Sequence, residues 1–230
     1  MNWERWARAA GVGFVVLTVI AFIVAGESPK VTDPTADVIS YYDGDRGQVL
    51  VSALLFGLAV VLLLWFAAAI ANQLRQSGEG RVGATVVAMG TAFVALQLTL
   101  VAVVASLAYS IAGDGDTGVV RAIFVLSVAI DSIAALPGAG FILAASVGLM
   151  RAHAVPQWLS GAGLAVAALF ALRSTTWASD GFWSPTGAFI FVVIAAGLLW
   201  ILATSVTLFL RAPSNAEAVE RRRTDTMLEG

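Results

Sequence analysis

Apolar residues fill six long intervals of the chain, and charged residues gather in the stretches between them. A helix needs about 20 mostly apolar residues to cross about 30 Å of hydrocarbon. The pattern therefore predicts an all-α integral membrane protein, a six-transmembrane-helix bundle formed by residues 1–212. Residues 213–230 are polar and are expected to form a cytoplasmic tail. The expected spans are about 9–25, 48–72, 82–112, 122–150, 157–172 and 186–210.

The third and fourth spans are longer than a bilayer requires. Each exceeds 20 residues by about ten, which corresponds to about 15 Å of helix. Residues 113–118 between them alternate glycine with polar residues, a composition typical of a tight turn. We therefore expect a long antiparallel hairpin whose helices tilt, kink or project past the bilayer.

Composition supports this class and excludes several others. Hydrophobic residues make up 59% of the 230 positions and charged residues 12%, whereas soluble domains carry about 25% charged residues. A net charge of −2 gives no basic footprint for nucleic acid. The chain has no cysteine and one histidine, His153, which argues against disulfides, iron–sulfur clusters and bis-histidine haem. We expect no cofactor and no nucleic-acid partner.

Basic residues are distributed unevenly between the two sides of the predicted bundle. Nine fall on the side of the termini and four on the other, so the positive-inside rule predicts that both termini are cytoplasmic. The near absence of lysine beside many arginines is typical of a high-GC bacterium, so we expect a multi-pass protein of a bacterial plasma membrane. The first span, with small residues Ala25 and Gly26 at its end, also resembles a signal peptide, but a retained first helix explains six spans more simply. The nine are Arg5, Arg8, Arg75, Arg81, Arg151, Arg211, Arg221, Arg222 and Arg223, and the four are Lys30, Arg46, Arg121 and Arg173.

Asp131 is the one ionisable residue within a predicted span. A charge there costs at least about 2.5–3.5 kcal/mol on insertion scales, so the carboxyl is expected to stay protonated or to face a polar interior. Ser127 lies one turn before it on the same face, and Gln97 lies on the neighbouring helix of the hairpin. One interpretation is a proton or ligand site formed by Asp131, Gln97 and Ser127. The other is an Asp131–Gln97 hydrogen bond that only fixes helix packing.

Two further features concern the fourth span. Pro137 removes a helix hydrogen bond and is followed by Gly138 and Gly140, so a kink is expected there. Small residues recur at every fourth position in Gly140, Ala144 and Gly148. Such a ridge permits close packing inside the bundle or in a homo- or hetero-oligomer.

The outer loops hold acidic and aromatic residues. Two Asp-Gly-Asp tripeptides on the same side offer four carboxylates, which suggest either a cation site or ordinary turns. The stretch Thr35–Tyr42 is expected to form a short interfacial helix capped by Asp33. In the last loop we expect interfacial aromatic anchors or a lid, and a possible Arg173–Asp180 pair. The four carboxylates are Asp43, Asp45, Asp114 and Asp116.

The segment from Ala154 to Leu164 contains Pro-x-Trp-Leu-Ser-x-x-Gly, with Pro156 and Trp158 at the entry of the fifth span. Together with Tyr41-Tyr42 and the leucine-rich run that ends at Arg75, it resembles a group of six-helix bacterial membrane proteins. These are known as a domain of unknown function, many of them from actinobacteria. The resemblance implies the six-helix layout and brings no activity or catalytic residue.

The sequence thus predicts a non-enzymatic membrane protein in the lipid bilayer. It would bind or pass a small or lipidic ligand, with Asp131 and Gln97 as polar anchors. The alternative is a packing or partner subunit of a membrane complex, and a membrane enzyme comes third. The chain lacks a metalloprotease H-E-x-x-H motif, a phosphate loop and paired intramembrane carboxylates, so we expect no catalytic residues.

Overall fold

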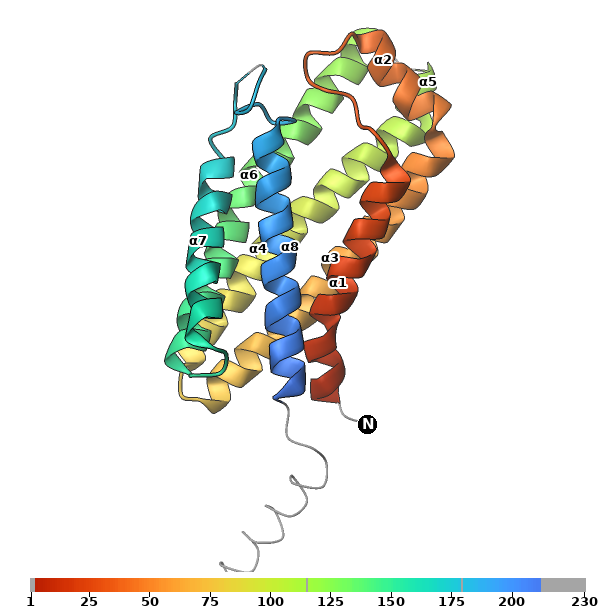
Figure 1. Cartoon of the computed structure of the whole chain (residues 1–230). Helices are drawn as coiled ribbons and strands as arrows, with labels where there is room; N and C mark the ends of the chain where they lie inside the picture. Colours follow the sequence, from red (N-terminus) through yellow and green to blue (C-terminus); the bar gives the residue numbers. More distant parts are fainter. Residues whose placement is uncertain (1–2, 115, 179, 212–230) are drawn as a thin grey trace, which may run out of the picture.

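The computed structural model describes residues 3–114, 116–178 and 180–211, and this part of the chain is helical without strands (Figure 1). The predicted tail, 213–230, lies outside the described residues. Each of the six predicted intervals falls on a long helix within a few residues. The long helices are α1 (Trp3–Ala25), α3 (Arg46–Gln76), α4 (Gly80–Ser106), α6 (Thr117–Arg151), α7 (Gln157–Arg173) and α8 (Ala188–Leu210). The short elements are α2 (Thr35–Ile39), η1 (Ser40–Gly44), η2 (Leu107–Ile111) and α5 (Ala112–Asp114).

Five of the described helices are long and apolar enough to cross a membrane: α1, α3, α4 continued by η2, α6 and α8. Large apolar side chains remain exposed on their outer faces, including Ile23, Leu54 and Leu199. An apolar outer face is what a lipid solvent requires. The remaining long helix, α7, has 17 residues. At 1.5 Å per residue it extends about 25 Å, less than the hydrocarbon thickness.

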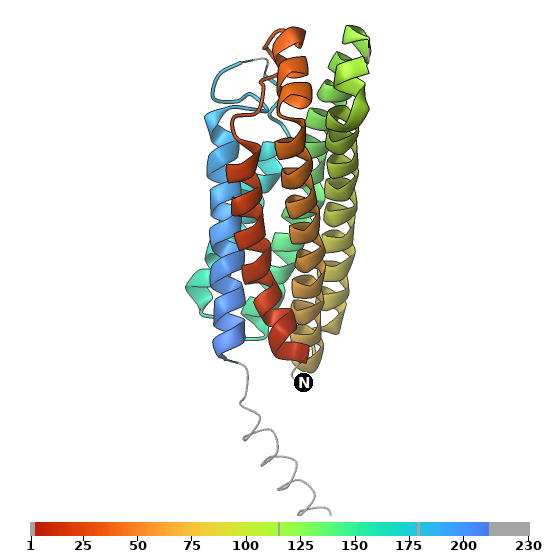
Figure 2. The same cartoon turned by 90° about the vertical axis from the view of Figure 1, so that its right-hand side faces the viewer.

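The long helices form a closed ring. α1 packs on α3, α3 on α4, α4 on α6, α6 on α7, α7 on α8, and α8 again on α1 (Figures 1 and 2). The hairpin predicted from the two longest spans is formed by α4 and α6. The start of α1 and the end of α8 lie at the same end of the bundle (Figure 1).

Helices α1 and α8 are held together at this end. Ser205 donates a hydrogen bond of 2.5 Å to the Arg8 carbonyl, and the Arg8 guanidinium donates to the Leu208 carbonyl at 3.2 Å and to Gln73 at 3.1 Å. Arg8 therefore satisfies a carbonyl in the last turn of α8. Its positive charge also interacts favourably with the partial negative charge at the C-terminal end of that helix. Gly11 permits the approach, since a Cβ there would lie 2.8 Å from the Ser205 Cβ.

The small-residue ridge of α6 packs inside the molecule. A Cβ on Gly140 would lie 3.0 Å from the Met89 sulfur on α4, and one on Gly148 would lie 2.5 Å from Leu74 of α3. The ridge thus serves contacts between neighbouring helices of one chain, which favours the bundle interpretation over the oligomer one.

Pro137 lies inside α6, and the helix continues through it to Arg151. The chain therefore does not break at this residue, and the predicted kink stays a prediction. Gly138 has a definite packing role, because a Cβ there would lie 3.1 Å from both Phe93 and Phe170. Its lack of a side chain lets α4 and α7 approach α6 at the same level.

A second, smaller core covers the end of the bundle opposite the termini. Tyr42 and Phe124 pack there edge to face, with ring centroids 6.3 Å apart. Arg121 donates to the carbonyls of Asp33 (2.9 Å) and Val31, which holds the first loop against α6. The buried members of this core are Val38, Tyr42, Val49, Leu107, Ala108, Ala112, Val120 and Phe124.

The predicted helix Thr35–Tyr42 forms as α2 followed by the π-helical turn η1. Its expected cap is wrong: the Asp33 carboxylate accepts from the Lys30 backbone N–H at 2.7 Å, and no side chain caps α2. The short Asp33 side chain can bond either to the backbone of its own turn or to the first N–H groups of the helix, and here it bonds to the turn.

Candidate functional site

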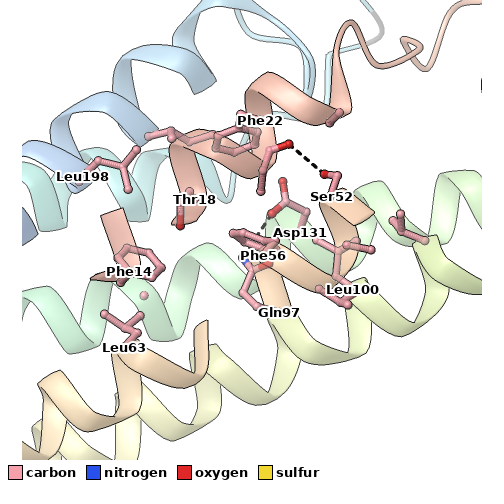
Figure 3. Close-up of a pocket in the computed structure, with 18 of the residues that line it drawn as sticks. Phe14, Thr18, Phe22, Ser52, Phe56, Leu63, Gln97, Leu100, Asp131 and Leu198 are labelled. Carbon is pink, nitrogen blue, oxygen red and sulfur yellow. Dashed lines mark hydrogen bonds between the residues drawn. The ribbon is translucent and has the colours of Figure 1, made fainter. Parts of the chain in front are cut away.

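A cavity of about 300 Å³ lies within the ring and is lined by residues of all six long helices (Figure 3). Its walls are mainly apolar, with aromatic rings such as Phe14, Phe56 and Phe93. A few polar groups interrupt these walls. An apolar pocket with a small number of convergent polar groups is the usual form of a ligand site. The polar or charged residues along the long helices that line it are Thr18, Ser52, Gln97, Asp131 and Arg173.

Asp131 and Gln97 meet in this cavity, as the hairpin predicted. The Gln97 side-chain amide donates to Asp131 Oδ1 across 3.4 Å, which is long for a hydrogen bond. α6 supplies the carboxylate and α4 the amide (Figure 3). The predicted pairing of these two residues is therefore present, although a weak contact of this length cannot by itself compensate a carboxylate.

The main partner of Asp131 is Arg173, the last residue of α7. Its guanidinium Nη2 forms an ion pair with Asp131 Oδ2. The Arg173 side chain is 4% exposed and the Asp131 side chain 32%. The carboxylate thus compensates a guanidinium that is almost completely buried, and it can still reach the open space of the cavity.

The sequence pattern predicts Arg173 in an outer loop with Asp180 as a partner, and the structure corrects this placement. Asp180 instead accepts from the Gly181 backbone N–H at 2.6 Å. The shortness of the fifth apolar interval is the sequence feature that could have predicted the buried position of Arg173. Helix α7 begins at the end of the bundle where α6 ends. Because α7 has 17 residues, it stops beside Asp131, before it reaches the other end of α6.

Three polar atoms of the cavity residues are buried without a hydrogen-bond partner: Thr18 Oγ1, Gln97 Oε1 and Arg173 Nε. The three residues are 2%, 3% and 3% exposed. Native proteins pair most buried polar groups with protein or water, since an unpaired one costs about 1–3 kcal/mol. No described protein group satisfies these three atoms.

Ser127 and two of the three residues predicted for the kink do not line the cavity. Ser127 is buried and donates to the Phe124 carbonyl at 2.7 Å, a bond within its own helix, and it does not line the cavity. Of the three predicted kink residues, Gly138 lines the cavity, and Pro137 and Gly140 do not.

The outer carboxylates do not form a metal site among the described residues, which contain no group of three or more His, Cys, Asp or Glu side chains suited to a metal. Asp116 accepts from the Gly118 backbone N–H at 2.6 Å and caps α6. Asp43 lies against Gly113, and Asp45 makes no capping bond to α3. The side chain of Asp114 lies outside the described residues. The turn interpretation thus accounts for Asp116.

The aromatic loop after α7 does not line the cavity, so it is not a lid in this structure. Trp183 stacks on Phe189 with ring centroids 4.7 Å apart and donates to the Thr175 carbonyl at 3.0 Å. Trp177 and Phe182 remain exposed. This arrangement resembles the interfacial anchoring expected of aromatic residues.

The described cavity residues offer binding groups rather than a reactive pair. The carboxylate is held by a guanidinium and an amide, and the hydroxyl of Ser52 donates to the Ala21 carbonyl at 3.0 Å. None of these contacts joins a nucleophile to a general base. Comparison with protein-family models, with curated proteins and with solved structures gave no match.

Proposed function

We propose that the chain is a six-span membrane protein that binds or passes a small or lipidic ligand in its central cavity, with Asp131 and Gln97 as polar anchors. The observation that carries the proposal is the cavity itself, since an apolar space inside a helical ring contains a line of linked polar groups. A packing role alone gives no reason for the open space beside Asp131 or for unpaired buried atoms there.

The proposed membrane is a bacterial plasma membrane, which the six long helices cross, with both termini in the cytoplasm. Because the chain has no cysteine, single cysteines report the orientation directly. Ser77→Cys and Thr32→Cys lie at opposite ends of the bundle and are both exposed. A membrane-impermeant maleimide added to intact cells should label Thr32→Cys and spare Ser77→Cys. The reverse pattern would overturn the orientation.

The alternative is a partner subunit of a membrane complex. The ridge of Gly140, Ala144 and Gly148 was its best support, and the structure uses Gly140 and Gly148 for contacts within the chain. A cavity that touches Asp131 favours the ligand proposal over this alternative.

Two neighbouring leucines on α8 give a matched test of ligand binding. Leu198 lines the cavity, whereas Leu199 is 65% exposed on the outer face. Leu198→Trp should fill the cavity, and Leu199→Trp should leave it open. The proteins are purified in nanodiscs made from their native membrane, and bound small molecules are extracted and identified by mass spectrometry. A compound carried stoichiometrically by wild type and Leu199→Trp, and lost from Leu198→Trp, is the expected result. Equal contents in all three proteins would refute the proposal.

A further inference from the structure

Three residues that line the cavity carry buried polar atoms without a hydrogen-bond partner, and these atoms restrict the chemistry of a ligand that reaches them. Gln97 Oε1 can only accept a hydrogen bond, and Arg173 Nε can only donate one. Thr18 Oγ1 can do either. A ligand group that satisfies both Gln97 and Arg173 must therefore both donate and accept. A hydroxyl or a primary amide does so, whereas a carboxylate cannot donate and a quaternary ammonium cannot take part at all.

The charges of the cavity point the same way. Asp131 and Arg173 already compensate each other, so the described polar wall of the cavity is neutral overall. An anionic ligand would have to displace Asp131 from Arg173, and a cationic ligand would have to displace Arg173 from Asp131. Either exchange leaves a charge poorly compensated in an apolar bundle, which is strongly unfavourable. An uncharged head group leaves the ion pair intact.

Residues of both α1 and α8 line the cavity. Among the described residues, the hydrogen bonds between these helices that join Arg8 with Leu208 and Ser205 with Arg8 lie at the end that holds the termini. Figure 1 shows the two helices separating toward the other end. Cavity-lining residues stand on both sides of this separation, Phe22 on α1 and Leu198 on α8 (Figure 3). Phe22 is 48% exposed.

We infer that the cavity takes an uncharged amphiphile with one hydrocarbon chain and a hydroxyl or primary amide head, which enters sideways from the bilayer between α1 and α8. This inference rests on the proposed function and specifies its ligand. The head group binds at Gln97, Arg173 and Thr18, and the chain lies against the aromatic wall. A volume of about 300 Å³ is at the low end of the about 300–1,000 Å³ typical of ligand sites, so the occupant is a small one.

The test uses three probes with the same chain: dodecanol, dodecanoate and dodecyltrimethylammonium. The full chain is reconstituted in phosphatidylcholine nanodiscs, and the thermal unfolding midpoint is titrated with each probe. A ligand that binds only the folded state raises this midpoint. Dodecanol should raise it in a saturable way, and the two charged probes should not. Leu198→Trp should abolish the effect of dodecanol, and the outer-face variant Leu199→Trp should retain it.

Thr18→Val separates head-group recognition from a structural role. The hydroxyl has no partner without ligand, so its removal should leave the ligand-free midpoint unchanged or slightly raised. Affinity for dodecanol should fall about fivefold, the equivalent of one neutral hydrogen bond. Thr99→Val, which removes an exposed hydroxyl from α4, is the matched control and should leave the affinity unchanged. Gln97→Leu should weaken dodecanol binding as well.

A larger shift with dodecanoate or the ammonium probe than with dodecanol would overturn the inferred head group. It would leave the proposed function standing if Leu198→Trp abolished that shift. Unchanged dodecanol affinity in both Thr18→Val and Gln97→Leu would mean that water alone serves these atoms, which also overturns the inference. The proposed function fails separately, when Leu198→Trp and Leu199→Trp retain the same bound compounds.

Discussion

The ion pair between Asp131 and Arg173 predicts that removing either charge destabilises the fold, and that the two losses of unfolding free energy are unequal. Asp131→Asn leaves the Arg173 guanidinium, 4% exposed, with a neutral partner. Breaking a buried pair by removing one charge costs about 3–5 kcal/mol, because the other charge stays buried. We expect a loss near the lower limit of that range, since an asparagine oxygen still accepts a hydrogen bond.

Arg173→Met should cost less. The remaining carboxylate is 32% exposed toward the cavity and still accepts from Gln97, so water and the amide can solvate it. We expect a loss of about 1.5–2 kcal/mol, the low end of the range for one hydrogen bond to a charged group. The double variant Asp131→Asn with Arg173→Met contains no uncompensated charge and should lie within about 1 kcal/mol of wild type.

The assay is reversible unfolding in mixed micelles, with the free energy of unfolding measured for wild type, both single variants and the double variant. The resulting cycle isolates the coupling between the two charges, expected to be at least about 2 kcal/mol. Asp180→Asn, an exposed acid in the following loop, is the control and should change stability by less than about 0.5 kcal/mol. A larger loss for Arg173→Met than for Asp131→Asn, or additive single losses, would refute the reasoning.

Three further predictions follow from local geometry. Gly163→Ala should destabilise by about 1–3 kcal/mol in the same unfolding assay, because its Cβ would collide with the Ser146 hydroxyl, whereas Gly161→Ala on the open face of α7 should be neutral or stabilising. Burial, and to a lesser extent Tyr41, raises the pKa of Tyr42; the phenol should not titrate near its ordinary pKa of about 10. The stability contributed by the raised pKa is present below about pH 10 and is lost as pH rises toward the pKa of Tyr42 in the folded state. Ultraviolet titration curves and the pH dependence of stability should therefore differ between Tyr42→Phe and wild type only above about pH 10. Arg121→Ala should increase amide hydrogen exchange in the first outer loop by at least tenfold, and unchanged exchange would show that its two carbonyl contacts do not hold the loop.

Helix positions were predictable because apolar length is a local property of the sequence. The Asp131–Gln97 contact was predictable too, since a short turn forces α4 and α6 to lie antiparallel and side by side. The prediction that Ser127 belongs to the site was wrong, because a shared helix face does not place two residues at the same level. Ser127 shares a helix face with Asp131 but lies one turn away along α6, where its hydroxyl bonds to its own backbone.

Arg173 was missed for a different reason. A charge at the end of an apolar interval is assigned to the membrane interface by default. Its actual depth depends on the length of α7 and on its packing against α6, and the second of these is a tertiary property. The outer Asp-Gly-Asp segments present the same difficulty, because convergence of their carboxylates depends on loop paths that no periodicity encodes. Asp116 alone showed a local preference strong enough to settle its role, as the cap of α6.

Arg8 and Arg173 together bear on the proposed orientation. The sequence pattern predicts one of them at each membrane surface, but both are buried in the structure with partners inside the chain. Leaving them out reduces the basic residues to eight on the side of the termini and three on the other. The asymmetry therefore does not depend on misplaced residues, and it becomes slightly stronger. A charge that packing neutralises within the bundle has little reason to be held at one membrane face, so the residues that still report orientation are those whose charge stays at the surface.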